Sequence, residues 1–255
     1  MKLKVLGCSG SEAKGHNTPG FLVNGVLMLD AGTITAALPV EAQCKITDIL
    51  ISHAHLDHIK SLAFLADSII GRIKKPVLIW AIPDVIEAIK KNLMNNVLWP
   101  DFTRIPTPEN PVFSYKPMEI EKTVTVAGLQ VKAIPMTHPV PAVGFLVRDS
   151  HASILYSGDT GRNELLWKEA AKTPNLKAVI VDTSFPNSLD SIATLSGHFT
   201  PAQLGADLTA SAVDSRISVF ISHIKPVYEK TVIRELASLG RKNIRILRAG
   251  KTYSF

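Results

Sequence analysis

The sequence predicts an α/β protein of the αββα sandwich type, in which two packed mixed sheets carry helices on both outer faces. Two observations support this fold class. Apolar runs of strand length fall into two groups along the chain, and each group is joined to segments with helical spacing of apolar residues. The chain of 255 residues is also long enough to bury a sizeable core, with no linker, repeat or low-complexity run. We therefore expect residues 1–255 to form a single domain.

The first half of the chain contains strand signals followed by helix signals. Apolar and polar residues alternate over residues 1–7, as in a half-buried strand. Asn24 and Gly25 form a strong two-residue hairpin signal between two apolar runs. Pro83 suits the first turn of a helix because its φ is already fixed near the helical value. The expected strands are 1–7, 21–23, 26–29, 48–52 and 77–80, and the expected helices are 58–70 and 83–93.

A segment rich in proline and aromatic residues, around Phe113 and Tyr115, precedes the second group of strands. After that group, strands and helices alternate, which favours parallel pairing with helices on the outer face. The polar residues at the ends of these strands should then lie along one edge of the sandwich. The expected strands are 120–126, 129–134, 143–147, 154–156, 178–182, 218–222 and 244–247, and the expected helices are 162–172, 201–212 and 227–239.

Composition excludes several classes of protein. Cys8 and Cys44 are too few and too far apart for a disulfide framework or a thiolate zinc site. No apolar run approaches the roughly 20 residues of a membrane helix, and the amino terminus lacks the apolar core of a secretory signal. A cytoplasmic protein without a membrane partner is expected. The net charge of +6 suits an anionic ligand, although such an excess is more often a solvated surface.

A metal-site motif follows the apolar residues 49–51. The run S-H-A-H-L-D-H at residues 52–58 places three imidazoles and a carboxylate within six positions. Neutral imidazole nitrogens and carboxylate oxygens are ligands that a divalent ion such as zinc prefers. Ligands this close in sequence cannot all reach one ion without strain, so the motif favours two ions over one. Zn²⁺ is the expected ion, with Mn²⁺ or Fe²⁺ as alternatives.

Three further candidate ligands stand where later strands end. They are His138, Asp159 and His223. Rigid backbone at a strand end can hold a ligand within the tolerance that metal geometry requires. Asp159 is the natural bridge between two ions, because its carboxylate has two oxygens and Gly158 beside it allows close approach of the backbone.

The order H-x-H-x-D-H, then H, then G-D-T, then S-H resembles the metallo-β-lactamase superfamily of binuclear hydrolases. This resemblance spans essentially the whole chain and implies the fold of that superfamily. It also implies how the seven ligands divide between the ions. The first ion takes His53, His55 and His138, the second takes Asp57, His58 and His223, and Asp159 bridges both.

Finer features resemble the class II cyclic-nucleotide phosphodiesterases. They are the leucine inside the metal motif and the segments 95–106, 184–189 and 196–201, none of which is needed to bind metal. The resemblance implies hydrolysis of 3′,5′-cyclic AMP or cyclic GMP to a nucleoside 5′-monophosphate. Two positions depart from the family: Lys60-Ser61 replaces an expected glycine, and Asp182 replaces a frequent glutamate.

Two other functions remain open from the sequence. A tRNA 3′-processing endonuclease similar to ribonuclease Z would share the ligands, but we find no glycine- and lysine-rich arm to grip a folded RNA, so a nucleic-acid partner is not expected. A non-catalytic nucleotide- or metal-binding protein of the same fold would be expected to lose ligands, and all are present. The sequence leaves a homodimer open.

His198 begins a helical segment and resembles the late histidine of phosphodiester-cleaving relatives. It could protonate the leaving oxygen or clamp the phosphate, because imidazole titrates near neutral pH. The alternative is a helix-start histidine satisfied by backbone groups. The predicted catalytic residues are thus His198, Asp57 and Asp159.

The remaining candidates each have two interpretations. Asp30 either receives a hydrogen bond from a ligating imidazole or accepts backbone amides in a turn. Asp182 either orients His198 or caps a helix. Trp99 and Phe102 either stack on a purine or pack in a core or subunit interface. Arg104 either contacts phosphate or is simply solvated.

Overall fold

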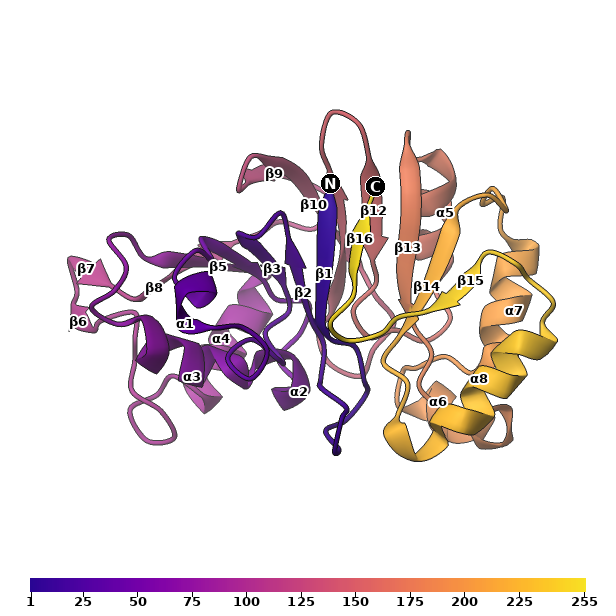
Figure 1. Cartoon of the computed structure of the whole chain (residues 1–255), viewed down its shortest axis with the longest axis horizontal. Coiled ribbons are helices and arrows are strands. Elements are labelled where there is room, and N and C mark those ends of the chain that lie inside the picture. Colours follow the sequence, from indigo (N-terminus) through magenta and orange to yellow (C-terminus); the bar gives the residue numbers. More distant parts are fainter.

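The structure is a computed structural model that describes residues 1–255. Two seven-stranded sheets face each other in the middle of the molecule (Figure 1). The first sheet has the order β16-β1-β2-β3-β4-β5-β8, with antiparallel pairs from β16 to β3 and parallel pairs from β3 to β8. Its strands are Lys2–Gly7 (β1), Gly20–Val23 (β2), Leu27–Leu29 (β3), Asp48–Leu50 (β4), Val77–Ala81 (β5), Phe113–Pro117 (β8) and Thr252–Ser254 (β16).

The second sheet repeats this mixture of pairings. It has the order β15-β14-β13-β12-β11-β10-β9, antiparallel from β9 to β12 and parallel from β12 to β15. Parallel strands direct their carboxyl ends to the same edge, so residues that follow them can meet there. The strands are Thr123–Val126 (β9), Leu129–Pro135 (β10), Val143–Arg148 (β11), Ser153–Tyr156 (β12), Leu176–Asp182 (β13), Ser218–Ser222 (β14) and Ile244–Ile246 (β15).

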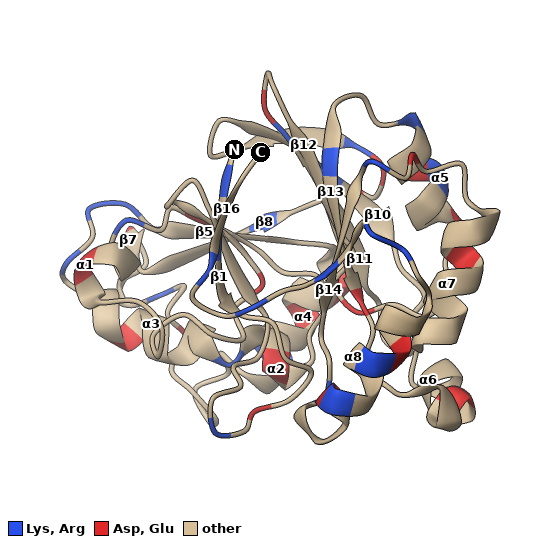
Figure 2. Cartoon of the chain, turned by 45° about the vertical axis from the view of Figure 1, so that its right-hand side comes forward, with Lys and Arg blue, Asp and Glu red and all other residues tan.

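Helices cover the outer side of each sheet, with α1 to α4 beside the first and α5 to α8 beside the second (Figures 1 and 2). None combines the length and apolarity needed to cross a membrane. The helices are Val40–Gln43 (α1), Leu56–Ile59 (α2), Ser61–Ile69 (α3), Pro83–Asn92 (α4), Glu164–Lys172 (α5), Asp190–Leu195 (α6), Pro201–Ala210 (α7) and Glu229–Ser238 (α8), with 3₁₀ turns Asn187–Leu189 and Pro226–Tyr228 and a small ribbon of Pro106–Thr107 (β6) and Asn110–Pro111 (β7).

The alternation of side chains along the second sheet builds two hydrophobic cores. On β13, Ile180 joins the core that includes the first sheet, whereas its neighbour Val179 joins a core with Trp167 of α5 and Leu204 of α7. Successive strand residues point to opposite faces, so one strand serves both layers. The predicted αββα sandwich with mixed sheets is therefore confirmed, while the single-domain boundary stays a prediction.

Several elements differ from the expected ones. The predicted helix 58–70 is two helices, because the amide of Ser61 donates to Ala31 O (2.8 Å) instead of continuing the helical ladder. The aromatic segment contains β8, which pairs with β5. Helix α6, helix α1, the β6–β7 ribbon and strand β16 were not expected; β16 is short and forms by pairing with β1 at the other end of the chain.

Candidate metal centre

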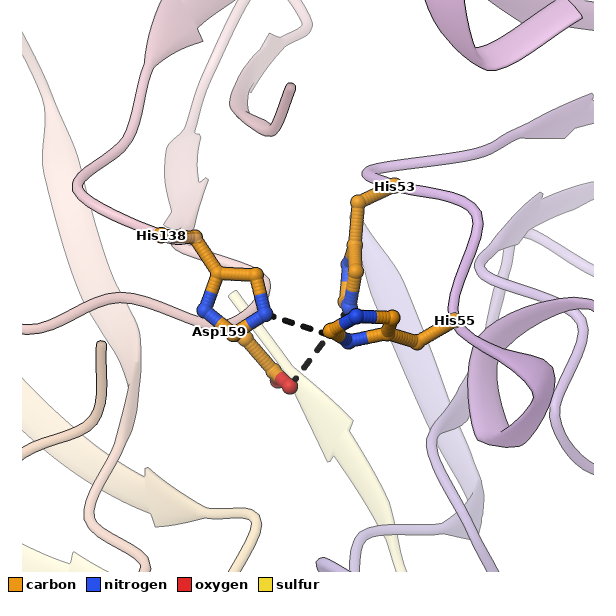
Figure 3. Close-up of side chains that lie close together, drawn as sticks. All are labelled: His53, His55, His138 and Asp159. Carbon is orange, nitrogen blue, oxygen red and sulfur yellow. Dashed lines mark hydrogen bonds and ion pairs between the residues drawn. The ribbon is translucent and has the colours of Figure 1, made fainter. Parts of the chain in front are cut away.

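The predicted ligands gather where strands of both sheets end. His53 and His55 follow β4, and Asp57 and His58 lie in the first turn of α2. His138, Asp159 and His223 follow β10, β12 and β14 of the second sheet. Figure 3 shows His53 and His55 approaching His138 and Asp159 from opposite sides. The structure thus brings together all seven residues that the sequence analysis named.

One group of donor atoms comes from His53, His55, His138 and Asp159, and these atoms lie within 4.8 Å of one another. His138 Nε2 is 3.1 Å from His55 Nδ1, and His53 Nε2 is 3.6 Å from Asp159 Oδ2 (Figure 3). His53 is fully buried, whereas His55 and His138 are half-buried. The group therefore opens to solvent on the side of His55 and His138.

A second group consists of Asp57, His58, Asp159 and His223. His58 Nε2 lies 3.2 Å from Asp159 Oδ1, and His223 Nε2 lies 3.3 Å from Asp159 Oδ2 and 3.2 Å from Asp57 Oδ2. Asp159 belongs to both groups, with its two oxygens facing different histidines. This is the position that the bridging role requires.

Hydrogen bonds fix the ring orientation of two predicted ligands that follow the first sheet, His53 and His58. His58 Nδ1 donates to Asp30 Oδ2 (2.7 Å). Ser52 Oγ donates to the same oxygen (2.8 Å) and accepts from His53 Nδ1 (3.0 Å). Each Nδ1 therefore carries the proton, and each Nε2 presents a lone pair to the cluster. Tyr156 Oη also donates to Asp30 (2.6 Å), so Asp30 is the hub of a buried network.

A similar network lies behind the second-sheet residues. His198 Nδ1 donates to Asp182 Oδ2 (2.5 Å). Ser184 Oγ donates to Asp182 Oδ1 (2.7 Å) and accepts from His223 Nδ1 (2.8 Å). His138 Nδ1 donates to Gly197 O (3.1 Å). These bonds again leave the Nε2 atoms of His138 and His223 as lone-pair donors that face the cluster.

The donor set fits a divalent cation. His53 Nε2 and Asp159 Oδ1 are buried and have no hydrogen-bond partner, a costly arrangement unless another group satisfies them. The lone pairs of His58 and His223 also face each other, with their Nε2 atoms 3.4 Å apart. Imidazole and carboxylate are the ligands of zinc-like ions, so the cluster is suited to divalent metal binding.

Buried charges shift the pKa values of the cluster in opposite directions. Burial raises the pKa of Asp159, but the neighbouring histidines His223 and His58 outweigh it and hold the pKa well below the usual value. Burial lowers the pKa of His58, yet Asp159 and Asp30 together raise it well above the usual value. Burial keeps the pKa of His53 low. A cation at His58 therefore competes with a proton.

His198 lies at the edge of the cluster, where it forms a third group of possible donors with Asp159, Asp182 and His223. Its ring stacks on His223 with centroids 5.2 Å apart, and it lies 5.3 Å from the ring of His138. Its side chain is nearly buried, and burial lowers its pKa, but the carboxylate of Asp182 more than offsets this and raises it. Asp182 thus occupies the position expected of a residue that orients His198. Asp30 and Asp182 both contact histidines, as the first of their two interpretations requires.

The residues expected to bind substrate lie elsewhere. Phe102 is buried in the core of the first sheet, which favours its packing interpretation. Trp99 is half-buried against Phe64 of α3, with ring centroids 5.5 Å apart, and Arg104 is exposed. None of these three residues forms a hydrogen bond or a ring contact with the predicted metal ligands. Substrate contact by Trp99 and Arg104 stays a prediction.

Sequence reasoning missed the residues that connect the ligands to the carboxylates. Ser52 and Ser184 relay hydrogen bonds, and Tyr156 contacts Asp30 from the second sheet. Ser52 directly precedes His53, and Ser184 stands two residues after Asp182, so their proximity was visible in the sequence. In the sequence, Tyr156 is indistinguishable from an ordinary buried strand residue, and its neighbours in sequence give no sign of its contact with Asp30.

The fold and the cluster define a protein of the metallo-β-lactamase fold. The structure superimposes on the metallo-β-lactamase fold protein YhfI from Bacillus subtilis with a TM-score of 0.78 and 17% identity, covering 99% of this chain and 98% of that one. It superimposes on unliganded yeast PDE1 with a TM-score of 0.83 and 20% identity, covering 98% of each chain.

The chain belongs to the family of class-II cAMP phosphodiesterases, whose pattern matches residues 33–235. It is 28% identical over 232 residues to 3′,5′-cyclic-nucleotide phosphodiesterase 1 of Saccharomyces cerevisiae, an alignment that covers 77% of this chain and 62% of the relative. The chain thus spans about three-fifths of the length of that relative. The resemblance drawn from the sequence is confirmed.

Proposed function

We propose that this protein is a binuclear metal-dependent phosphodiesterase that hydrolyses 3′,5′-cyclic nucleotides to nucleoside 5′-monophosphates. The observation that carries the proposal is the pair of donor groups that share Asp159, with the ring of His198 against a histidine of each group. We place His198 outside the ligand set because its Nδ1 and the carboxylate of Asp182 are already bonded to each other. Family membership supports the same substrate class. His53, His55, His138 and Asp159 would hold one ion, and Asp57, His58, His223 and Asp159 the other.

Divalent ions held there would lower the pKa of a nearby water molecule and would attract the negatively charged phosphate. The chain's own groups do the rest. His198 donates its Nδ1 proton in a hydrogen bond to Asp182 and can carry a second proton on Nε2, because Asp182 raises the pKa of the ring. That proton is transferred to the leaving ribose oxygen as the phosphodiester bond breaks, so that no free alkoxide has to form.

Turnover of cyclic AMP and cyclic GMP, beside cleavage of a precursor tRNA at equal enzyme concentration, tests the proposal. We expect release of nucleoside 5′-monophosphate from the cyclic nucleotides after loading with Zn²⁺ or Mn²⁺, and little tRNA cleavage. Efficient tRNA 3′ cleavage with negligible cyclic-nucleotide hydrolysis would favour the ribonuclease Z-like function. No turnover of any phosphodiester would favour a non-catalytic binding protein.

Metal analysis tests the two-ion arrangement separately. Saturation with zinc should give two equivalents for each chain, both of them needed for full activity. Maximal activity with a single equivalent would contradict the binuclear site.

The charged residues are dispersed over the chain, with Lys and Arg interspersed among Asp and Glu (Figure 2). This distribution does not point to a particular partner.

A further inference from the structure

A cavity of about 260 Å³ adjoins the metal centre at His55. Its walls come from three segments: the loop after β4, helix α4, and the loop between β10 and β11. A larger cavity of about 730 Å³ lies between α5 and α7, but no metal ligand lines it. Of these two cavities, the one at His55 is therefore the one that a substrate held at the metals could enter. Its lining residues are Ala54, His55, Asp84, Val85, Ala88, Val140 and Pro141.

The lining of this cavity is apolar apart from His55 and one carboxylate. Val85 forms a buried part of the wall, and Val140 and Pro141 border the cavity from the other sheet. Such walls suit a flat ring system, while a few placed polar groups determine its orientation. Asp84, in the first turn of α4, is exposed and has no basic partner, whereas Glu87 one turn later pairs with Lys90 at 2.7 Å.

Resting on the proposed function, we propose that this cavity binds the base of the cyclic nucleotide and that Asp84 makes it prefer guanine to adenine. The phosphate is attracted to the metal centre and repelled by the Asp84 carboxylate, so charge alone orients the nucleotide with its base toward Asp84. His55 lies between the phosphate position and the base position, because it belongs to the first donor group and also lines the cavity.

The preference for guanine follows from the number of donors that a carboxylate can accept. Guanine has two adjacent donors, N1–H and the N2 amino group, which match the two oxygens of a carboxylate. Adenine offers only its N6 amino group, next to the N1 acceptor that a carboxylate repels. A good bidentate contact discriminates between bases by about 1–3 kcal/mol, or roughly 5- to 150-fold. Asp84 is therefore a specificity-determining residue.

The test compares Asp84→Asn with the matched control Glu87→Gln on the same helix. The measurements are kcat/KM for cyclic GMP, cyclic AMP and bis(p-nitrophenyl) phosphate, which has no base, and the affinities for GMP and AMP by calorimetry. We expect the parent to prefer the guanine ligand at least about 5-fold in both measurements. Asp84→Asn should bring this ratio close to one, and Glu87→Gln should leave it unchanged.

A second variant tests the cavity without touching the carboxylate. Ala88→Phe should fill the space and raise KM for both cyclic nucleotides more than for bis(p-nitrophenyl) phosphate. Equal effects on all three substrates would contradict the proposal that the base binds in this cavity. A parent without guanine preference, or an unchanged ratio in Asp84→Asn, would overturn the role of Asp84.

The outcomes also separate this inference from the proposed function. If neither cyclic nucleotide is hydrolysed but GMP binds more tightly than AMP in an Asp84-dependent way, the cavity assignment stands and the proposed activity is wrong. If both are hydrolysed and Asp84→Asn behaves like Glu87→Gln, the activity stands and the assignment of Asp84 is wrong.

Discussion

The two sheets contribute to the metal centre in different ways. The first sheet contributes four proposed ligands from a single loop and turn after β4, within residues 53–58. The second sheet contributes His138, Asp159 and His223, each after a different strand. The first set is local, so its spacing alone indicates a metal site. The second set meets only because the register of the sheet aligns the strand ends.

Despite this difference, the two sheets hold their histidines by the same arrangement of hydrogen bonds. In each, one buried carboxylate bonds one histidine directly and a second through a serine: Asp30 with Ser52, and Asp182 with Ser184. The histidines they reach differ in role. Asp30 supports two proposed ligands, His58 and His53, whereas Asp182 supports the proposed ligand His223 and the non-ligand His198. In the proposed function, the first network therefore positions metal ligands, and the second also positions the proton donor His198.

The shared ligand Asp159 allows the largest test of this comparison. Asp159→Ala removes a carboxylate from both donor groups, so we expect both ions to be lost and turnover to fall by at least about 10⁴-fold, as for groups that act as one unit. Metal content and turnover measure this. Circular dichroism should show a folded protein, because the carboxylate contributes little apolar burial.

Asp67→Ala is the matched control, since Asp67 is an exposed carboxylate on α3. It should retain metal and activity. If Asp159→Ala kept one full equivalent of metal and substantial turnover, the two sheets would form separate sites instead of one shared centre.

His198→Ala should affect turnover and leave the ions bound. General acid catalysis contributes roughly 10²–10⁴-fold, so we expect a loss of turnover in that range with two equivalents of metal retained. The loss should shrink for a phosphodiester with a nitrophenolate leaving group, because that oxygen departs without a proton. Equal impairment on both substrates would indicate a phosphate clamp, and full activity would indicate a purely structural histidine.

The two carboxylates allow a direct comparison of the networks. Asp30→Asn should weaken metal binding by roughly 10- to 100-fold, as expected for a partner of ligating histidines. Asparagine suits this position because Asp30 has a φ of 56°, which asparagine tolerates. Asp182→Asn should reduce turnover more than it reduces metal affinity, because it removes the charge that raises the pKa of His198.

A competition titration with a zinc chelator measures the affinities, and initial rates at saturating zinc measure turnover. Identical profiles for the two variants would mean that both networks only hold metal ligands, which would remove the functional difference between the sheets.

The sequence predicted the members of the histidine and aspartate cluster more completely than it predicted the residues that support them. The seven proposed ligands follow recognisable apolar runs, and their residue types suit metal binding. Ser184 and Tyr156 have no comparable signal in the sequence. The role of a buried serine or tyrosine depends on the residues that folding places next to it.

The same reason explains the errors in the fold. Long periodic strands and helices were found, whereas β16 depends on pairing with β1 at the other end of the chain. The break between α2 and α3 depends on hydrogen bonds from Ser61 to Ala31 and Gly32. Both are tertiary interactions, so the local spacing of apolar residues could not predict them.

The smallest effect is expected when a serine is removed from the second network. Ser184→Ala deletes the acceptor of His223 Nδ1, and Asp182 Oδ1 at 3.9 Å is too far to replace it. A hydrogen bond contributes about 0.5–1.5 kcal/mol, so zinc affinity should fall by roughly 2- to 12-fold while His198 keeps its direct bond to Asp182. Ser238→Ala, which deletes a hydroxyl bonded to a backbone carbonyl on α8, is the control. A larger loss of zinc affinity in Ser184→Ala than in Asp182→Asn would mean that the serine, and not the carboxylate, fixes the ring of His223. No change at all would mean that the second sheet holds His223 through its backbone alone.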